Sequence, residues 1–228
     1  MKQDVLKFNF KFKSSDFFVN DKNYFAYNLI KNWPNWDSQF VYIYGLEKCG
    51  KTLITEIWSN KSKAIYLNDK NFTKTFPDKL DLVYIKSNNW ILDDVDKIIE
   101  LKNNVINKKI LNFINIVKTN PNSYLIMTGK CSPNHIACNL KDLTSRMLAS
   151  IVVEIKDPDE ELLCLIIQKY LQDRNIILQD KCLNFISDRI ERTYEYALKF
   201  AKKIDLESLE KKSNISIYFL KSLFEKKF

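Results

Sequence analysis

The sequence predicts an α/β protein in which a parallel sheet domain is followed by a small all-helical domain. Short apolar runs typical of buried strands occur at residues 40–44, 64–67, 90–92, 124–128 and 151–155. Helical patterns lie between these runs, and the clearest covers residues 106–117. Strands that alternate with helices predict a parallel sheet with helices on both faces. After Pro158 no strand-like run remains, and apolar residues recur only at helical spacing.

The boundary between the two expected domains is near Pro158. Beyond it, helices are expected at residues 162–171, 181–190, 193–204 and 215–224. A chain of 228 residues is long enough for one large domain with a small appendage. We therefore expect an N-terminal peptide at residues 1–10, an α/β domain over residues 11–157 and a helical domain over residues 158–228.

The segment between the first expected strand and the next expected helix reads GLEKCGKT, from Gly45 to Thr52. It fits the G-x4-G-K-T pattern of a nucleotide phosphate-binding loop (P-loop), in which glycines let backbone N–H groups surround the phosphates. We expect Lys51 to contact the β- and γ-phosphates and the Thr52 hydroxyl to bind Mg²⁺. The nucleotide-binding residues expected in this loop are Gly45, Cys49, Gly50, Lys51 and Thr52. Because this pattern lies between an expected strand and an expected helix, where a P-loop belongs, we interpret it as a P-loop and not as a chance match.

An acidic pair follows the third expected strand, in the sequence WILDD. This is the Walker B form, which supplies a carboxylate at the end of a neighbouring strand. We expect Asp93 to hold Mg²⁺, directly or through water, and Asp94 to polarise an attacking water as a general base. The alternative is an ordinary helix N-cap with an acidic first turn. Together with the P-loop, the pair favours the functional interpretation.

Two further polar residues are candidates because of their place in the order of strands. Thr128 ends the fourth expected strand, at a level where its hydroxyl can sense a γ-phosphate, although threonine is also an ordinary strand residue. Arg146 lies just before the last strand, where an arginine can project toward a neighbouring subunit and stabilise transition-state charge there. Its alternative is a surface ion pair.

Composition narrows the environment and the class of partner. The 36 Lys and Arg against 28 Asp and Glu give a net charge of +8, but the lysines are spread along the chain, so a solvated surface is favoured over a nucleic-acid face. The five cysteines form no CxxC pair and are expected to be reduced thiols. Without a signal-peptide core or an apolar run of about twenty residues, the chain is expected to be cytoplasmic.

These motifs resemble those of the DnaA-related branch of AAA+ proteins, and in particular its alphaproteobacterial regulatory inactivators of DnaA. The matching segments are residues 16–19 with Asn23, residues 32–36, the GKT helix with Trp58, and residues 125–129, 140–146 and 152–159. The resemblance implies a P-loop AAA+ sheet domain with a small all-helical lid, binding ADP or ATP with Mg²⁺. It places Asn23 near the adenine and implies that Arg146 acts on a neighbouring subunit.

The N-terminal residues QDVLKF match the Q-x-x-L-x-F type of sliding-clamp peptide, through Gln3, Leu6 and Phe8. The same residues fit a first strand, since apolar side chains alternate there. DnaA continues after its lid into a helix-turn-helix domain, and this chain is expected to lack one. The resemblance therefore implies a clamp-tethered adaptor whose partners are DnaA and the polymerase III sliding clamp. Such an adaptor would reach DNA only through the clamp and would not contact a membrane. It could also form homo-oligomers. An autonomous ATPase or helicase-loader-like protein acting on nucleic acid is the alternative, and a nucleotide-stabilised scaffold is a third.

Three positions depart from the family pattern. Lys48 stands where many P-loops carry another glycine, and Lys130 replaces an acidic residue that DnaA carries after the sensor strand. The position that aligns with the sensor-2 arginine of the DnaA lid is Glu195, with Arg192 three residues earlier. Loss of that cation should weaken γ-phosphate sensing. We therefore expect bound ADP or weak self-hydrolysis.

Overall fold

A computed structural model describes residues 19–68, 72, 82–100, 103–211 and 214–225 of the chain. The expected clamp-binding residues Gln3, Leu6 and Phe8 lie outside the described residues, as does most of the matching segment at residues 16–19. In the part of the chain that is described, no helix is both long and apolar enough to cross a membrane.

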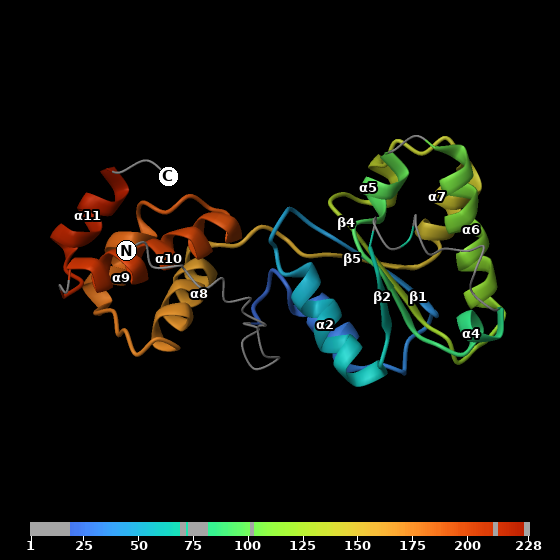
Figure 1. The fold of residues 1–228 in the computed structure, drawn as a ribbon, viewed down its shortest axis with the longest axis horizontal. Coiled ribbons are helices and arrows are strands. Elements are labelled where there is room, and N and C mark those ends of the chain that lie inside the picture. Colours follow the sequence, from blue (N-terminus) through green and yellow to red (C-terminus); the bar gives the residue numbers. More distant parts are fainter. Residues whose placement is uncertain (1–18, 69–71, 73–81, 101–102, 212–213, 226–228) are drawn as a thin grey trace, which may run out of the picture.

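The centre of the fold is a five-stranded parallel sheet with the order β2-β3-β4-β1-β5 (Figure 1). Its strands are β1 (Phe40–Tyr44), β2 (Ile65–Leu67), β3 (Trp90–Leu92), β4 (Leu125–Gly129) and β5 (Ile151–Glu154). All five are parallel, so their carboxyl ends lie along one edge of the sheet. The predicted parallel α/β sheet is therefore confirmed, and β4 ends one residue later than the sequence suggested.

Helices cover both faces of the sheet. One face carries α1 (Tyr24–Lys31) and α2 (Lys51–Ser62), and the other carries α4 (Leu82–Lys86), α5 (Val95–Glu100), α6 (Asn104–Lys118) and α7 (Lys141–Leu148). Alternation along β1 divides its side chains between these two cores: Val41 packs in the core that contains Trp58, and Tyr42 in the core that contains Phe113. The sheet is thus buried on both sides, as its apolar strands require.

Four helices follow the last strand: α8 (Glu160–Gln172), α9 (Asp180–Ser187), α10 (Tyr194–Lys211) and α11 (Ile217–Glu225). They form a lid with its own core, centred on buried side chains such as Leu163 and Phe200. Figure 1 shows the lid at the opposite end of the molecule from α6. Leu162 and Tyr194 join the sheet-domain core on the α2 face, so they connect the two parts.

The sequence did not predict several short elements. Helices α1, α4, α5 and α7 have five to eight residues each. Such helices contain too few turns for a clear apolar period. Helix α2 runs to Ser62, and Lys63 then ends it in a left-handed conformation with φ 57°.

Candidate functional site

The P-loop from Gly45 to Thr52 connects β1 to α2 at the carboxyl edge of the sheet. A Cβ atom on Gly45 would lie 2.4 Å from the Ile155 carbonyl oxygen, so the close approach of β5 requires glycine. Gly50 caps α2 with φ 98°, which is also a glycine conformation. Lys48 has a φ of 58°, so lysine occupies a left-handed position in this loop where glycine would be less strained.

The ammonium group of Lys51 lies inside its own loop. It donates hydrogen bonds to the carbonyl oxygens of Gly45, at 2.6 Å, and Leu46, at 2.8 Å, and only 7% of the residue is exposed. The Cys49 thiol is 3.8 Å from the same nitrogen. Burial raises the pKa of this thiol, while the charge on Lys51 acts in the opposite direction.

Asp93 and Thr128 come together although they are 35 residues apart. The Thr128 hydroxyl donates a hydrogen bond to the Asp93 carboxylate at 2.5 Å and accepts one from the Asp94 backbone N–H at 2.9 Å. Since β3 and β4 are parallel neighbours, their carboxyl ends bring these residues into contact. One hydroxyl therefore links the Walker B pair to the sensor strand.

The second oxygen of the Asp93 carboxylate accepts a hydrogen bond from the Tyr66 hydroxyl, at the end of β2. Burial, followed by this hydrogen bond, raises the pKa of Tyr66, while hydrogen bonds with Thr55 and Thr52 act against the shift. Tyr66 therefore lies between the predicted magnesium ligands Asp93 and Thr52. Sequence inspection did not identify this tyrosine, because a tyrosine in a strand is ordinary.

The proposed general base Asp94 is held by an ion pair with Lys97, 2.6 Å from its carboxylate. Its backbone has a φ of 51°, in the turn just before α5. The hydrogen bond to Asp94 raises the pKa of Lys97. Lys97 lies three residues after Asp94, a spacing at which side chains on a helical turn meet. This ion pair was not predicted from the sequence, although the spacing could have suggested it.

A second ion pair joins the end of β4 to the P-loop. Lys130 lies 2.5 Å from the Glu47 carboxylate, and the hydrogen bond between them raises the pKa of the lysine. The backbone N–H of Lys130 donates to the buried Asp96 carboxylate at 2.7 Å. The sequence had singled out Lys130 only as a departure from the family pattern, and it gave no signal for Glu47.

A pocket of about 570 Å³ lies between the P-loop and the lid. Its lining comes from the loop, the end of β4, the turn after β5 and the start of α10: Leu46, Glu47, Lys130, Asp157, Pro158, Glu191, Arg192, Thr193, Tyr194, Tyr196 and Lys199. The Tyr194 hydroxyl is buried and has no hydrogen-bond partner among the described residues. Arg192 forms an ion pair with Glu160 at the start of α8, whereas the Glu195 side chain is outside the described structure.

None of the predicted site residues that the structure describes is among those that line this pocket, and two of them lie elsewhere in the fold. Asn23 is buried before α1, and its side-chain oxygen accepts a hydrogen bond from the Asn20 backbone. Arg146 is half-buried in the last turn of α7, and its side chain makes no hydrogen bond or ion pair with the residues that the structure describes. Because α7 leads to the start of β5, Arg146 lies toward the amino ends of the strands, away from its own P-loop.

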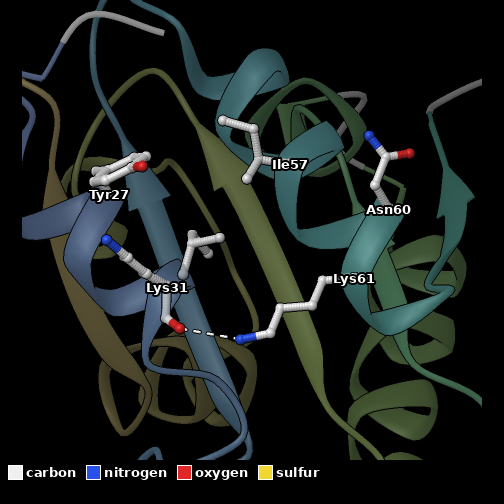
Figure 2. Close-up of a pocket in the computed structure, with 6 residues that line it drawn as sticks. Tyr27, Lys31, Ile57, Asn60 and Lys61 are labelled. Atoms are coloured by element: carbon white, nitrogen blue, oxygen red, sulfur yellow. Dashed lines mark hydrogen bonds between the residues drawn. The ribbon is translucent and has the colours of Figure 1, made fainter. Parts of the chain in front are cut away.

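A second pocket, of about 460 Å³, lies between α1 and α2 (Figure 2). It is lined by Tyr27, Ile30, Lys31, Ile57, Asn60 and Lys61. The Lys61 ammonium closes one side by donating to the carbonyl oxygens of Lys31, at 3.0 Å, and Trp33, at 2.8 Å. None of the predicted site residues lines this pocket.

Sequence comparison identifies relatives of the chain, although no protein-family model matches it. The DnaA chromosomal replication initiator of Campylobacter jejuni is 27% identical over 262 residues, covering 98% of this chain and 58% of DnaA. The chain is similar to DnaA over almost its whole length, and its fold is that of AAA+ P-loop domains. It spans just over half the length of that DnaA. An uncharacterised protein of Haemophilus influenzae is 24% identical over 215 residues, covering 90% of each chain.

Solved structures agree with this DnaA-related fold. Domain III of Thermotoga maritima DnaA has a TM-score of 0.76 at 18% identity, covering 91% of this chain and 92% of that one. A DnaA bound to AMPPCP and single-stranded DNA has a TM-score of 0.73 at 22% identity, covering 87% of this chain and 67% of that one. The T. maritima RuvB branch migration motor has a TM-score of 0.63 at 15% identity, covering 82% and 61%.

Proposed function

We propose that this chain binds ADP or ATP with Mg²⁺ at Gly45–Thr52. The observation that carries the proposal is the convergence of the P-loop, Asp93 and Thr128 at one edge of the sheet, beside a pocket of about 570 Å³. Similar DnaA structures that hold AMPPCP support an adenine nucleotide.

In this proposal the chain's own groups divide the binding between them. Lys51 exchanges the carbonyl oxygens of its loop for phosphate oxygens, which form stronger, charge-assisted hydrogen bonds. Thr52 and Asp93 supply oxygen ligands for Mg²⁺, which neutralises phosphate charge when it is bound. Tyr66 and Thr128 orient the Asp93 carboxylate.

Replacing Lys51 with Ala tests this binding. The variant should lose at least about tenfold in affinity for both ATP and ADP, because it removes a charged hydrogen-bond donor to phosphate. Calorimetric titration measures both affinities, and the exposed Lys118→Ala serves as the matched control. Unchanged affinity in Lys51→Ala would exclude the P-loop as the nucleotide site.

The cellular role that we propose is of the Hda type: a clamp-tethered adaptor that stimulates ATP hydrolysis on DnaA and so prevents re-initiation of DNA replication. The resemblance of residues 140–146 supports Arg146 as the residue that completes the site on DnaA. Its position in the last turn of α7 and its lack of an ion-pair partner among the described residues favour action on another subunit. Weak turnover by the chain itself is consistent with Asp94 being paired to Lys97.

The Arg146→Ala variant tests the adaptor role. Phosphate release from ATP-loaded DnaA is followed with DNA-loaded clamp present. Wild-type chain should accelerate release, and Arg146→Ala should lose at least about a hundredfold of that stimulation, as loss of an arginine in trans does. The lid variant Arg189→Ala is the matched control and should stimulate normally. Full stimulation by Arg146→Ala would contradict the proposed role.

The clamp tether is tested separately. Changing Gln3 and Leu6 to Ala should abolish retention of the chain on immobilised clamp, because the peptide loses both its polar and its apolar anchor. Nucleotide affinity should not change. Retention of the double variant would favour the strand interpretation of these residues.

The alternative is an autonomous ATPase that acts on nucleic acid. The observation in its favour is that Asp94 lies beside an Asp93 carboxylate already oriented by Thr128 and Tyr66. Such an enzyme would hydrolyse ATP without DnaA, and Asp94→Asn would abolish this turnover. Its affinity for DNA would also fall as salt is raised.

A further inference from the structure

Lys130 occupies an unusual position at the junction of the sensor strand and the P-loop. It directly follows Gly129, the last residue of β4, two residues after Thr128. The hydrogen bond from its backbone N–H to the buried Asp96 carboxylate, at 2.7 Å, fixes the backbone at this point. Its side chain therefore extends from a backbone position that is held in place.

The Lys130 ammonium crosses from β4 to the P-loop, where it meets the Glu47 carboxylate at 2.5 Å. Both residues line the pocket between the loop and the lid. Their side chains are 44% and 58% exposed, so water and ions screen the attraction, and such pairs contribute little to stability. A more highly charged group that enters the pocket can displace the carboxylate.

A terminal phosphate is such a group. It carries more negative charge than a carboxylate and presents more acceptor oxygens to an ammonium group. Lys51 donates hydrogen bonds to carbonyl oxygens of its own loop, whereas Lys130 pairs with a carboxylate. The position of Lys51 inside the loop suits a phosphate that ADP and ATP share. Lys130 stands beside Thr128, on the sensor side of the site, so it suits the phosphate that only ATP has.

We propose that Lys130 discriminates ATP from ADP by exchanging the Glu47 carboxylate for the terminal phosphate of ATP. This inference rests on the proposed nucleotide binding at Gly45–Thr52. Glu47 holds the lysine in the pocket before ATP binds, and competes with the phosphate for it. Lys130 then supplies a cation for the terminal phosphate from the sheet side of the site. The position aligned with the sensor-2 arginine carries a glutamate, Glu195, and so does not supply one.

Four proteins test the exchange: wild type, Lys130→Met, Glu47→Gln and the double variant, each titrated calorimetrically with ATP and with ADP in Mg²⁺. Lys130→Met should weaken ATP binding about tenfold and ADP binding less than about twofold, because one charged hydrogen bond to the terminal phosphate is lost. Glu47→Gln should strengthen ATP binding about threefold, since the competing carboxylate is removed. In the Lys130→Met background, Glu47→Gln should have no such effect.

Two controls accompany the titrations. The exposed Lys118→Met should leave both affinities unchanged, and Lys130→Arg should keep the preference for ATP. Equal weakening of ATP and ADP by Lys130→Met would overturn the inference while leaving nucleotide binding intact. A gain from Glu47→Gln that persists without Lys130 would also overturn it, because Glu47 would then act by direct repulsion. If wild-type protein binds neither nucleotide, the proposed function itself fails.

Discussion

At the scale of single residues, Thr128 connects the parts of the site. Its hydroxyl both donates to Asp93 and accepts from the Asp94 backbone, and the side chain is fully buried. The sequence predicted a role in sensing phosphate. The structure adds a positioning role, since the carboxylate of Asp93 is oriented by this hydroxyl and by that of Tyr66.

Replacing Thr128 with Val tests that positioning role. The variant keeps the shape of the side chain but leaves the partly buried Asp94 N–H without this acceptor, so the free energy of unfolding should fall by about 1–3 kcal/mol. Urea denaturation measures the change. Thr119→Val, at the exposed end of α6, should change stability by no more than about 0.5 kcal/mol. Equal effects of the two substitutions would contradict the positioning role.

Tyr66 makes stability depend on pH in the alkaline range. A phenol ionises near pH 10 in the unfolded chain, and its pKa is raised in the folded protein by burial and the hydrogen bond to Asp93. Above about pH 10 the unfolded chain therefore binds fewer protons than the folded one, and stability should decrease as pH rises. Urea unfolding at pH values of about 8, 9 and 10.5 measures this effect, and the free energy of unfolding should decrease less in Tyr66→Phe than in wild type. In the control variant Tyr218→Phe, which changes an exposed tyrosine, the free energy of unfolding should decrease as much as in wild type.

At the scale of elements, the contact between β1 and β4 sets the position of the sensor strand. A Cβ atom on Gly129 would lie 2.0 Å from the Tyr42 hydroxyl oxygen, which itself donates to the Cys131 carbonyl at 3.0 Å. Glycine at the end of β4 thus lets the tyrosine of β1 cross beneath the turn. Thr128 and Lys130 flank this glycine, so the packing of two strands determines where both side chains point.

The Gly129→Ala variant should lower the free energy of unfolding by about 1–3 kcal/mol, as overpacking of a buried contact does. In the Tyr42→Phe background the hydroxyl oxygen is gone and the nearest ring atom is 3.0 Å away, so the same substitution should cost less. Thermal or urea unfolding of the four proteins in this cycle measures the coupling. An equal cost in both backgrounds would show that another contact limits the site.

At the scale of the whole molecule, the sheet domain and the lid have separate hydrophobic cores joined by a few residues. The four tryptophans, Trp33, Trp36, Trp58 and Trp90, belong to the sheet domain, whereas the lid is entirely helical. Leu162 and Tyr194 bridge the two parts on the α2 face. The candidate nucleotide pocket lies at this junction, so a ligand there contacts both parts.

The two cores should respond separately to mutation. Phe200 is fully buried in the lid, with its ring centroid 4.3 Å from that of Phe224. Phe200→Ala should destabilise the lid by about 3–5 kcal/mol. The urea midpoint seen by far-UV circular dichroism should then fall further than the midpoint seen by tryptophan fluorescence.

Phe113→Ala is the matched control in the sheet domain, because Phe113 is buried and packs against Trp90. It should lower the tryptophan midpoint instead. If Phe200→Ala lowered both midpoints equally, the chain would unfold as one cooperative unit and the bridging residues would couple the cores fully.

The sequence by itself determined the parallel α/β architecture, and it predicts the P-loop and the Walker B pair, because these depend on local patterns: apolar runs, helical spacing and the glycines beside Lys51. It did not predict short helices such as α1 and α5, whose few turns carry little periodicity. It also did not determine which side chains meet at the site. The contacts of Asp93 with Thr128 and Tyr66, and of Lys130 with Glu47, join residues from different strands and the loops that follow them. Only the strand order β2-β3-β4-β1-β5 brings those loops to one edge, since hydrogen bonding between strands distant in sequence sets which carboxyl ends are neighbours.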